Sequence, residues 1–290
     1  MAQDFLGHLR LRVLVLDGAM GTMLFEKGLP QGEPPERWNL IHPELVQEIH
    51  FAYLEAGCDI IETNTFGASR LKLRAYGLDH QSTRLNYLGA RLAREVCREG
   101  CFVAGSIGPA GGQVAKADEC REFFEEQAQA LARGGVDLLL VETMTDVEEA
   151  CLAVSAARAT GLPTIVSMVF ERGEDGYRTL GGISLEEAAM RLLQAGADGL
   201  GCNCLDPDIA GGIIESLKKL TNCLLIVQPH AGLPRLREGR LIYPFGPEAM
   251  AEQYRTILAA QPDLVGGCCG TTPAHIAHLV QIVRRGIKAS

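Results

Sequence analysis

The cysteines in the last third of the chain are the side chains best suited by type and spacing to do chemistry. Cys268 and Cys269 are adjacent in the segment GGCCGT at 266–271, and Cys202 and Cys204 lie upstream in the segment GCNC. Neighbouring residues of a β-strand point to opposite faces, so adjacent thiols reach one metal ion only where the backbone leaves strand geometry. The flanking glycines permit that departure. The pattern indicates either a metal site or one core thiol beside one exposed thiol.

A third thiol from another strand end favours the metal site. Three thiolates form a soft site suited to tetrahedral zinc, and three protein ligands leave the fourth position open. Such a site would accept a thiol substrate and hold it as the thiolate, which is the nucleophilic form. The sequence offers Cys202 and Cys204 as candidates for this ligand, and both would lie on the same face of a regular strand.

A carboxylate beside a glycine turn near the N-terminus suits an amino acid. In the segment DGAMGT at 17–22, Asp17 would contact an ammonium group, and backbone N–H groups of the turn would contact a carboxylate. Glu142, at another predicted strand end, would complete a clamp for a zwitterion. Acidic residues at strand ends also cap the following helix, which is the alternative role for each of them.

Short apolar, β-branched runs alternate with helical stretches along the chain, as in sheets built from βαβ units. Eight such runs in 290 residues match a (β/α)8 TIM barrel, whereas a doubly wound open sheet usually has fewer strands and a topological switch point. We predict a single barrel domain over residues 1–290. Its strands are expected at 13–17, 58–63, 102–106, 137–142, 164–169, 199–204, 224–228 and 264–267.

Capping boxes and glycines predict where helices begin and end. Thr145 with Glu148, and Ser184 with Glu187, are typical of helix starts. Glycines just past apolar-periodic segments predict helix ends at positions 57, 100, 134, 161 and 196.

A barrel brings the carboxyl ends of its strands to one rim, where barrel enzymes keep their active sites. The stretches 28–38 and 232–247 are predicted to lie over that rim as irregular loops. The polar residues at or just after the predicted strand ends are Asp17, Glu62, Asn64, Ser106, Glu142, Asn203, Cys204, Gln228, His230, Cys268 and Cys269.

Charge and composition exclude several classes of partner. The formal charge of −9 argues against nucleic acid and against an anionic membrane surface. No apolar run approaches the roughly 20 residues of a membrane helix, and no secretory signal is recognisable. Ten cysteines in such a chain predict a cytoplasmic protein with reduced thiols rather than a disulfide framework. Thiols outside the two motifs are expected to be structural, and His275 and His278 to lie on the surface of the last helix.

Together these motifs resemble those of the homocysteine S-methyltransferases. The resemblance spans nearly the whole chain and implies a (β/α)8 barrel, homocysteine as methyl acceptor, and a zinc ion bound by Cys204, Cys268 and Cys269. Cys202 would then be a neighbour of the site. The motifs are DGAMGT at 17–22, ETNTFG at 62–67, GSIGP at 105–109, ET at 142–143, GCNC at 201–204 and GGCCGT at 266–271.

The resemblance also implies which residues contact homocysteine. Asp17 and Glu142 would lie near its amino group. The turn after Asp17 would lie near its carboxylate. The implied contacts are Asp17, Gly18, Gly21, Thr22, Asn64, Ser106 and Glu142. One residue departs from the family pattern, because His230 stands where an Asn commonly precedes Ala-Gly-Leu-Pro.

The amino-acid sequence of the first glycine turn most resembles that in the homocysteine module of cobalamin-dependent methionine synthase. It is equally similar to that of proteins that join this domain to a methylenetetrahydrofolate reductase. The resemblance therefore implies methylcobalamin or a methyl-folate-linked donor, delivered by a separate module, with methionine as product. S-methylmethionine and betaine are the alternative small donors. Two rival functions are a phosphate-binding barrel lyase or isomerase, because barrel loops after strands seven and eight often bind phosphate, and a non-catalytic zinc-binding barrel.

Overall fold

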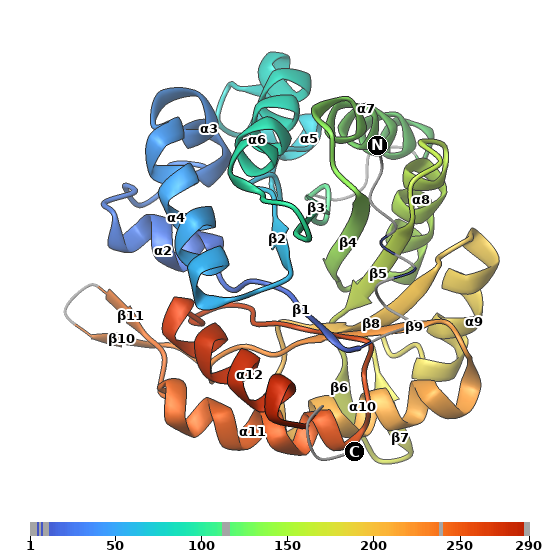
Figure 1. Ribbon diagram of the computed structural model, residues 1–290. Helices are drawn as coiled ribbons and strands as arrows, with labels where there is room; N and C mark the ends of the chain where they lie inside the picture. Colours follow the sequence, from blue (N-terminus) through green and yellow to red (C-terminus); the bar gives the residue numbers. More distant parts are fainter. Residues whose placement is uncertain (1–4, 6, 8–11, 112–116, 238–239, 287–290) are drawn as a thin grey trace.

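Eight parallel strands close into a barrel, as the sequence predicts (Figure 1). The computed structural model describes residues 5, 7, 12–111, 117–237 and 240–286. The strand order is β1-β12-β9-β8-β5-β4-β3-β2, and a bridge between Leu16 and Ile60 joins β1 to β2 and closes the ring. The strands are β1 (Leu14–Val15), β2 (Ile60–Glu62), β3 (Phe102–Ile107), β4 (Leu138–Met144), β5 (Thr164–Met168), β8 (Gly199–Asn203), β9 (Leu224–Gln228) and β12 (Leu264–Val265).

Helices follow the strands and cover the outside of the barrel (Figure 1). No helix within the described ranges is both long and apolar enough to cross a bilayer. The helices are α2 (Met20–Glu26), α3 (Trp38–Ile41), α4 (Pro43–Ala56), α5 (Arg70–Arg74), α6 (Ser82–Val96), α7 (Ala117–Gly134), α8 (Val147–Arg158), α9 (Leu185–Ala195), α10 (Pro207–Leu220), α11 (Pro247–Ala259) and α12 (Pro273–Gly286), with 3-10 turns at Pro35–Arg37 and Asp79–Gln81.

Local signals set the helix boundaries where side chains can cap the backbone. The Ser184 hydroxyl accepts a hydrogen bond from the Glu187 N–H at the start of α9, as predicted. Gly57 and Gly196 end α4 and α9 in the left-handed conformation. The predicted cap of α8 is wrong by one residue: Asp146, not Thr145, accepts a hydrogen bond from the backbone N–H of the first turn. Strand β4 extends to Met144, so the helix begins later than the sequence suggests.

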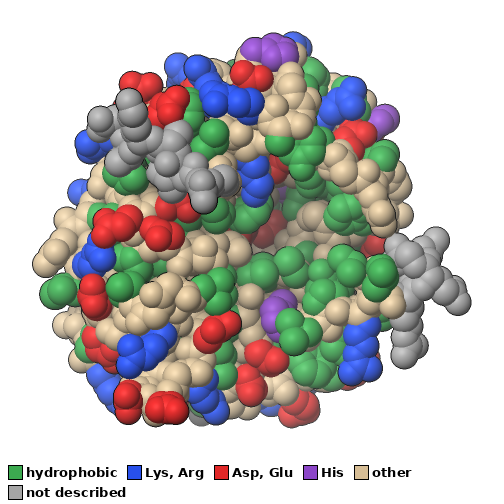
Figure 2. Space-filling view, turned by 180° about the vertical axis from the view of Figure 1, so that it is seen from behind, with side chains coloured by type: hydrophobic (Ala, Val, Ile, Leu, Met, Phe, Trp, Pro, Cys, Tyr) green, Lys and Arg blue, Asp and Glu red, His purple; other side chains and the backbone are tan. Residues whose placement is uncertain are grey.

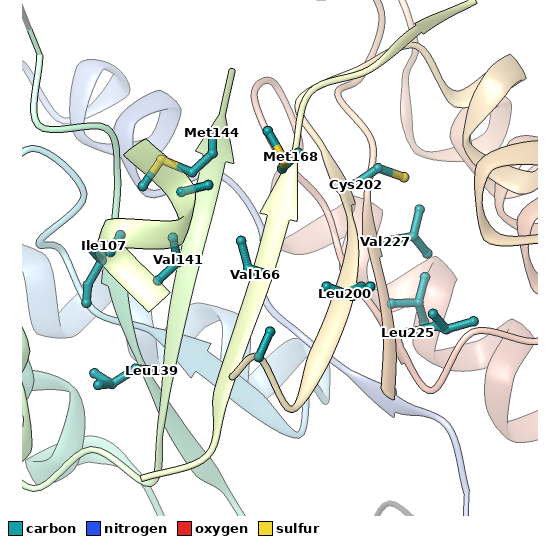
Figure 3. Close-up of a cluster of buried hydrophobic side chains, with 14 of the residues drawn as sticks. Ile107, Leu139, Val141, Met144, Val166, Met168, Leu200, Cys202, Leu225 and Val227 are labelled. Carbon is teal, nitrogen blue, oxygen red and sulfur yellow. The ribbon is translucent and has the colours of Figure 1, made fainter. Parts of the chain in front are cut away.

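Two hydrophobic layers follow from the alternation of side chains along the strands. Leu138 and Leu140 of β4 belong to the cluster inside the barrel, where Phe5 packs edge-on against Phe102. Leu139 and Val141 face the helices instead, in the larger cluster between the sheet and its cover (Figure 3). This period of two is the pleat of a strand buried on both faces.

Two short hairpins extend the barrel connections. One follows β5 and pairs β6 (Glu171–Gly173) with β7 (Gly176–Arg178). The other pairs β10 (Arg235–Arg237) with β11 (Arg240–Ile242), so the stretch predicted as irregular at 232–247 contains antiparallel pairing. Leu233, Leu236 and Leu241 are strongly exposed there. Elsewhere charged side chains of both signs cover the surface, and Figure 2 shows a face on which hydrophobic side chains gather around a central hollow.

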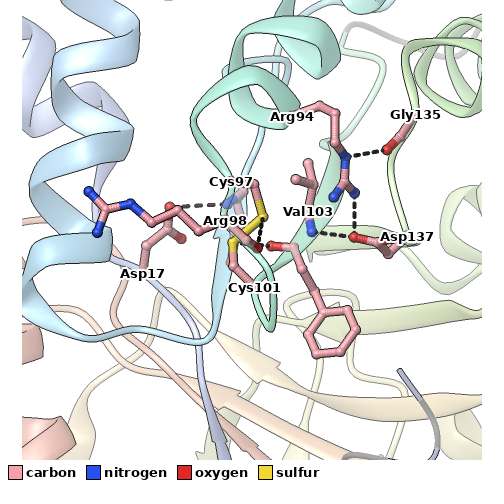
Figure 4. The surroundings of a disulfide bond; sticks show 10 residues. Asp17, Arg94, Cys97, Arg98, Cys101, Val103, Gly135 and Asp137 are labelled. Atoms are coloured by element: carbon pink, nitrogen blue, oxygen red, sulfur yellow. Dashed lines mark hydrogen bonds and ion pairs between the residues drawn. A yellow bond between two sulfur atoms is a disulfide. The ribbon is translucent and has the colours of Figure 1, made fainter. Parts of the chain in front are cut away.

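Cys97 and Cys101 form a disulfide, which corrects the expectation that both thiols are free (Figure 4). Cys97 directly follows α6 and Cys101 directly precedes β3. The chain reverses between them through Gly100, whose φ is 84°, and the two Cα atoms come within 5.7 Å, a separation that a disulfide spans. The prediction weighed the compartment and overlooked this turn. The remaining eight cysteines are free.

His275 is buried, which corrects its predicted place on the helix surface. Its Nδ1 accepts a hydrogen bond from the Thr272 N–H at 3.1 Å, beside the start of α12, so its Nε2 carries the proton and donates to the Phe245 carbonyl at 2.9 Å. The spacing of His275 and His278 described the helix correctly. It carried no information about the segment before α11 that covers His275.

His50 of α4 is fully buried, and neither ring nitrogen has a hydrogen-bond partner within the described part of the chain. Burial lowers the pKa of His50 from 6.5 to about 4. The unfolded chain therefore takes up a proton here at pH values where the folded chain does not. The contribution of neutral His50 to the free energy of unfolding is fully present above about pH 6.5 and is lost as the pH falls towards 4.

We expect the free energy of unfolding of the wild type to fall by about 2 kcal/mol more than that of His50→Leu when the pH is lowered from 7 to 5. The reason is that the substitution removes the buried titrating ring. Urea unfolding at the two pH values measures this difference. His80→Leu, at an exposed position, is the matched control and should behave as the wild type does. Equal losses in His50→Leu and the wild type would contradict the prediction.

Candidate active site and metal centre

A cavity of about 390 Å³ lies at the carboxyl ends of the strands. It brings together residues that are far apart in sequence, including nearly all of those predicted for the site. Asp17 is the exception: it is buried and does not line the cavity. The predicted residues that line the cavity are Gly18, Gly21, Thr22, Asn64, Ser106, Glu142, Cys204, Cys268 and Cys269.

Three thiols meet on one side of this cavity. The Sγ atoms of Cys204, Cys268 and Cys269 all lie within 4.8 Å of one another, and those of Cys204 and Cys269 are 3.8 Å apart. Strand β12 ends at Val265, so the adjacent pair lies outside regular strand geometry, as the sequence predicts. The Cys268 N–H donates to the Pro229 carbonyl, and the Cys269 carbonyl accepts from the Ala231 N–H, which fixes the loop against the segment after β9.

Glycines before the cysteine pair allow this loop to pack closely. A Cβ on Gly266 would lie 2.8 Å from the Cβ of Leu16, and one on Gly267 would lie 2.3 Å from Oγ1 of Thr271. Any side chain at either position would push the loop away from its neighbours. The two glycines are therefore needed for the position of the thiols as well as for backbone freedom.

Cys202 and Cys204 do not share a face, contrary to the expectation from strand alternation. Strand β8 ends at Asn203, and Cys204 takes a left-handed φ of 53°, which turns its side chain into the cavity. Cys202 remains in the regular strand and packs in the outer layer beside Val227 (Figure 3). Burial raises the pKa of the Cys202 thiol well above its ordinary value. The structure therefore separates Cys202 from the three clustered thiols.

The arrangement of the three thiols fits a tetrahedral metal. Sulfur atoms about 2.3 Å from a zinc ion at tetrahedral angles lie about 3.8 Å apart, which is the Cys204–Cys269 separation. Hydrogen bonds from Cys204 and Cys268 lower the pKa of the Cys269 thiol to about 3. This lowered pKa favours the thiolate, the form in which a cysteine binds metals.

Three carboxyl groups lie on the opposite side of the site. Oδ2 of Asp17 accepts a hydrogen bond from the Glu62 N–H at 3.0 Å, and Glu62 accepts one from the side-chain amide of Gln228. Glu142 accepts from the Ser106 hydroxyl and, at 3.2 Å, from Nδ2 of Asn203. Oδ1 of Asp17 is buried and has no hydrogen-bond partner among the described residues.

The pKa of each of the three carboxyl groups is raised. Burial is the largest cause for Asp17, Glu62 and Glu142, and the charge of Glu142 adds repulsion at both other groups. Within the described ranges, no Lys or Arg forms an ion pair with any of the three. The cavity therefore combines soft sulfur ligands with a group of carboxyl side chains that has no fixed cation beside it.

Sequence reasoning noted Glu62, Asn203 and Gln228 at strand ends but gave them no role. The Asn203 side chain accepts from the Thr143 N–H at 2.8 Å and from the Ser167 hydroxyl at 2.9 Å, so it fixes the end of β4 next to Glu142. The signal that would have found all three is the strand-end rule, applied equally to every strand.

His230 and Asn64 both lie at the rim, but a position at the rim does not by itself show that a residue contacts the substrate. His230 is buried, and its Nδ1 has no hydrogen-bond partner in the described part of the molecule. Nδ2 of Asn64 donates to Oδ1 of Asn39 and to the Pro35 carbonyl, both at 2.9 Å. The Asn64 amide thereby fastens the segment at Pro35–Arg37 to the end of β2.

A sequence model of the homocysteine S-methyltransferase family matches residues 14–283. The chain belongs to this family. This homocysteine S-methyltransferase is similar in structure to the homocysteine methyltransferase MmuM from Escherichia coli. The metallated form of MmuM gives a TM-score of 0.79 at 26% identity, over 94% of this chain and 97% of that one. The oxidized form gives 0.78 at 28% identity, over 93% and 96%.

More distant barrels share the fold alone. The carboxyl transferase domain of Rhizobium etli pyruvate carboxylase gives a TM-score of 0.56 at 16% identity, over 97% of this chain and 49% of that one. The family match confirms the predicted enzyme class. The rival predictions of a phosphate-binding lyase or isomerase and of a non-catalytic zinc-binding barrel are therefore not retained.

We expect Cys268→Ala to lose tightly bound metal, because only two clustered thiols would remain, and Cys202→Ala to keep it. Metal content after washing with a chelator, measured by plasma mass spectrometry, distinguishes the two variants. Far-ultraviolet circular dichroism of both should match the wild type. One retained equivalent in Cys268→Ala, or its loss from Cys202→Ala, would show that the ligand group is wrong.

Proposed function

We propose that this homocysteine S-methyltransferase binds a zinc ion through Cys204, Cys268 and Cys269 and methylates the thiol of homocysteine, giving methionine. The observation that carries the proposal is one cavity lined by three convergent thiols and by the carboxyl groups of Glu62 and Glu142, with buried Asp17 bonded to the Glu62 N–H. Zinc bound there would hold the substrate thiol as its thiolate near neutral pH. The chain's own residues then have to orient an amino acid whose sulfur faces the cysteines.

The carboxyl groups bind the substrate ammonium in this proposal. Glu142 lines the cavity and is held by Ser106 and Asn203, so its oxygens are oriented before substrate arrives. Asp17 supports it with a buried oxygen, Oδ1, that has no hydrogen-bond partner in the described structure. An ammonium group would supply the missing cation and return the raised pKa values towards the ordinary range.

The turn after Asp17 binds the substrate carboxylate. Gly18, Gly21 and Thr22 line the cavity, and a Cβ on Gly21 would meet no atom within 4 Å, so the space beside it is open to a ligand. Backbone N–H groups at this turn would contact the carboxylate, as they do in other anion-binding turns. Holding both ends of the amino acid leaves the sulfur as the only group free to face the cysteines.

Methylcobalamin or a methyl-folate-linked donor brings the methyl group from outside the barrel. Two features support this part of the proposal: the amino-acid sequence of the first glycine turn, DGAMGT at 17–22, and a cavity whose size suits an amino acid rather than a corrin. The sulfur of homocysteine attacks the methyl carbon, the new S–C bond forms, and the bond from the methyl group to its carrier breaks. No side chain carries the methyl group.

The donor is tested by measuring methionine from homocysteine with free methylcobalamin, S-methylmethionine or betaine in separate reactions. We expect slow turnover with free methylcobalamin, because no second module holds it over the rim. Turnover with S-methylmethionine alone at ordinary enzymatic rates, about 1 per second or more, would rule out the cobalamin-linked donor and leave the acceptor assignment intact.

We expect Glu142→Gln to weaken homocysteine binding by about ten- to a hundredfold, the size of one charged hydrogen bond, while metal content stays unchanged. Calorimetric titration with homocysteine measures the affinity. Glu148→Gln, an exposed position on α8, is the matched control. Unchanged affinity in both Glu142→Gln and Asp17→Asn would remove the ammonium clamp from the proposal.

A further inference from the structure

The turn after Asp17 and the cysteine loop meet at one buried side chain, that of Thr271. Its Oγ1 donates to the Cys268 carbonyl at 2.7 Å and accepts from the Ala19 N–H at 3.2 Å. A hydroxyl carries one proton, so donating to one segment and accepting from the other fixes its rotation. The same atom therefore holds both the segment of a cysteine ligand and the turn that lines the amino-acid end of the cavity.

Tyr53 of α4 closes a small network around this contact. Its hydroxyl lies 3.2 Å from the Ala19 carbonyl and 3.1 Å from the Thr271 carbonyl, and the residue is fully buried. The Ala19 N–H also lies 3.3 Å from the Thr271 carbonyl. A buried group that loses its partner leaves an unsatisfied polar atom, so neither segment can shift alone without cost.

Steric contacts remove the remaining freedom. A Cβ on Gly18 would lie 2.6 Å from Oγ1 of Thr271, and one on Gly267 would lie 2.3 Å from the same atom. Thr271 therefore fills the space between the two glycine segments. Close packing of this kind transmits small displacements from one segment to the other.

We propose that Thr271, supported by Tyr53, is a positioning residue that couples the cysteine loop to the turn after Asp17. Metal bound to the cysteines then changes the affinity of the cavity for the amino and carboxyl groups of the substrate. The inference rests on the proposed function, because it assigns the metal to one segment and the amino acid to the other. Linkage makes the effect reciprocal: an amino acid in the cavity tightens metal binding by the same factor.

The test uses L-2-aminobutyrate, which has the amino and carboxyl groups of homocysteine but no sulfur. This probe lacks the thiol through which homocysteine would reach the metal, and its amino and carboxyl groups occupy the other end of the cavity in the proposal, so an effect of the metal on its affinity passes through the protein. Calorimetric titration compares metal-loaded with metal-free wild-type protein. We expect binding to the loaded form to be about fivefold tighter or more.

Three variants test whether the hydrogen bonds of Thr271 and Tyr53 cause this difference in affinity. Thr271→Val keeps the shape of the side chain but removes the hydroxyl. In this variant the ratio of the affinities of metal-loaded and metal-free protein for 2-aminobutyrate should fall below about twofold, because the coupling loses one hydrogen bond. Thr271→Ser keeps the hydroxyl and should restore the wild-type ratio. Tyr53→Phe should also reduce it. Tyr254→Phe is the matched control, since its hydroxyl donates to the Gly266 carbonyl in the same loop and makes no contact with Ala19.

The outcomes separate this inference from the proposed function. A wild-type ratio of one, or an unchanged ratio in Thr271→Val, overturns the coupling even if the enzyme makes methionine normally. Absence of both 2-aminobutyrate binding and methionine formation overturns the proposed function and the coupling together. A lowered ratio in Thr271→Val that serine restores supports the coupling, because a merely structural defect would lower both affinities equally.

Discussion

Three carboxyl groups without a fixed cation are the constraint on which the rest of the site depends. Burial raises the pKa of Asp17, Glu62 and Glu142, and the charge of Glu142 raises the pKa of the other two further. Burying acid groups without a basic partner is costly, and hydrogen bonds reduce that cost at Glu62 and Glu142, whereas Oδ1 of Asp17 has no partner among the described residues. This explains why amides and hydroxyls, rather than basic residues, stand behind it.

The closed barrel is what makes this arrangement possible. The two thiol segments follow β8 and β12, which are separated in the sheet by β9, and the acids lie at or near the carboxyl ends of β1, β2 and β4. Only a ring of parallel strands brings these ends to one rim. The same geometry explains why the metal ligands occupy one side of the cavity and the carboxyl groups the other.

The strand pattern was predictable from sequence because buried parallel strands read as continuous apolar runs. All eight strands, and the departure of the Cys268–Cys269 pair from strand geometry, follow from such local signals. The split between Cys202 and Cys204 did not, since it depends on one left-handed residue at the end of β8. The burial of His275 depends on a contact between segments, which a one-dimensional pattern does not contain, whereas the Cys97–Cys101 disulfide depends on a local turn through Gly100 that the prediction overlooked.

The chain's one tryptophan gives the site an optical reporter that needs no label. Trp38 is buried at the start of α3, with its ring 4.8 Å from that of His42. The neighbouring Pro35 carbonyl accepts a hydrogen bond from Asn64, and Nδ2 of Asn39 donates to the Asn64 carbonyl at 2.7 Å. Asn64 lines the cavity, so a ligand that shifts this wall changes the surroundings of the indole. Its fluorescence can therefore follow the filling of the cavity in real time.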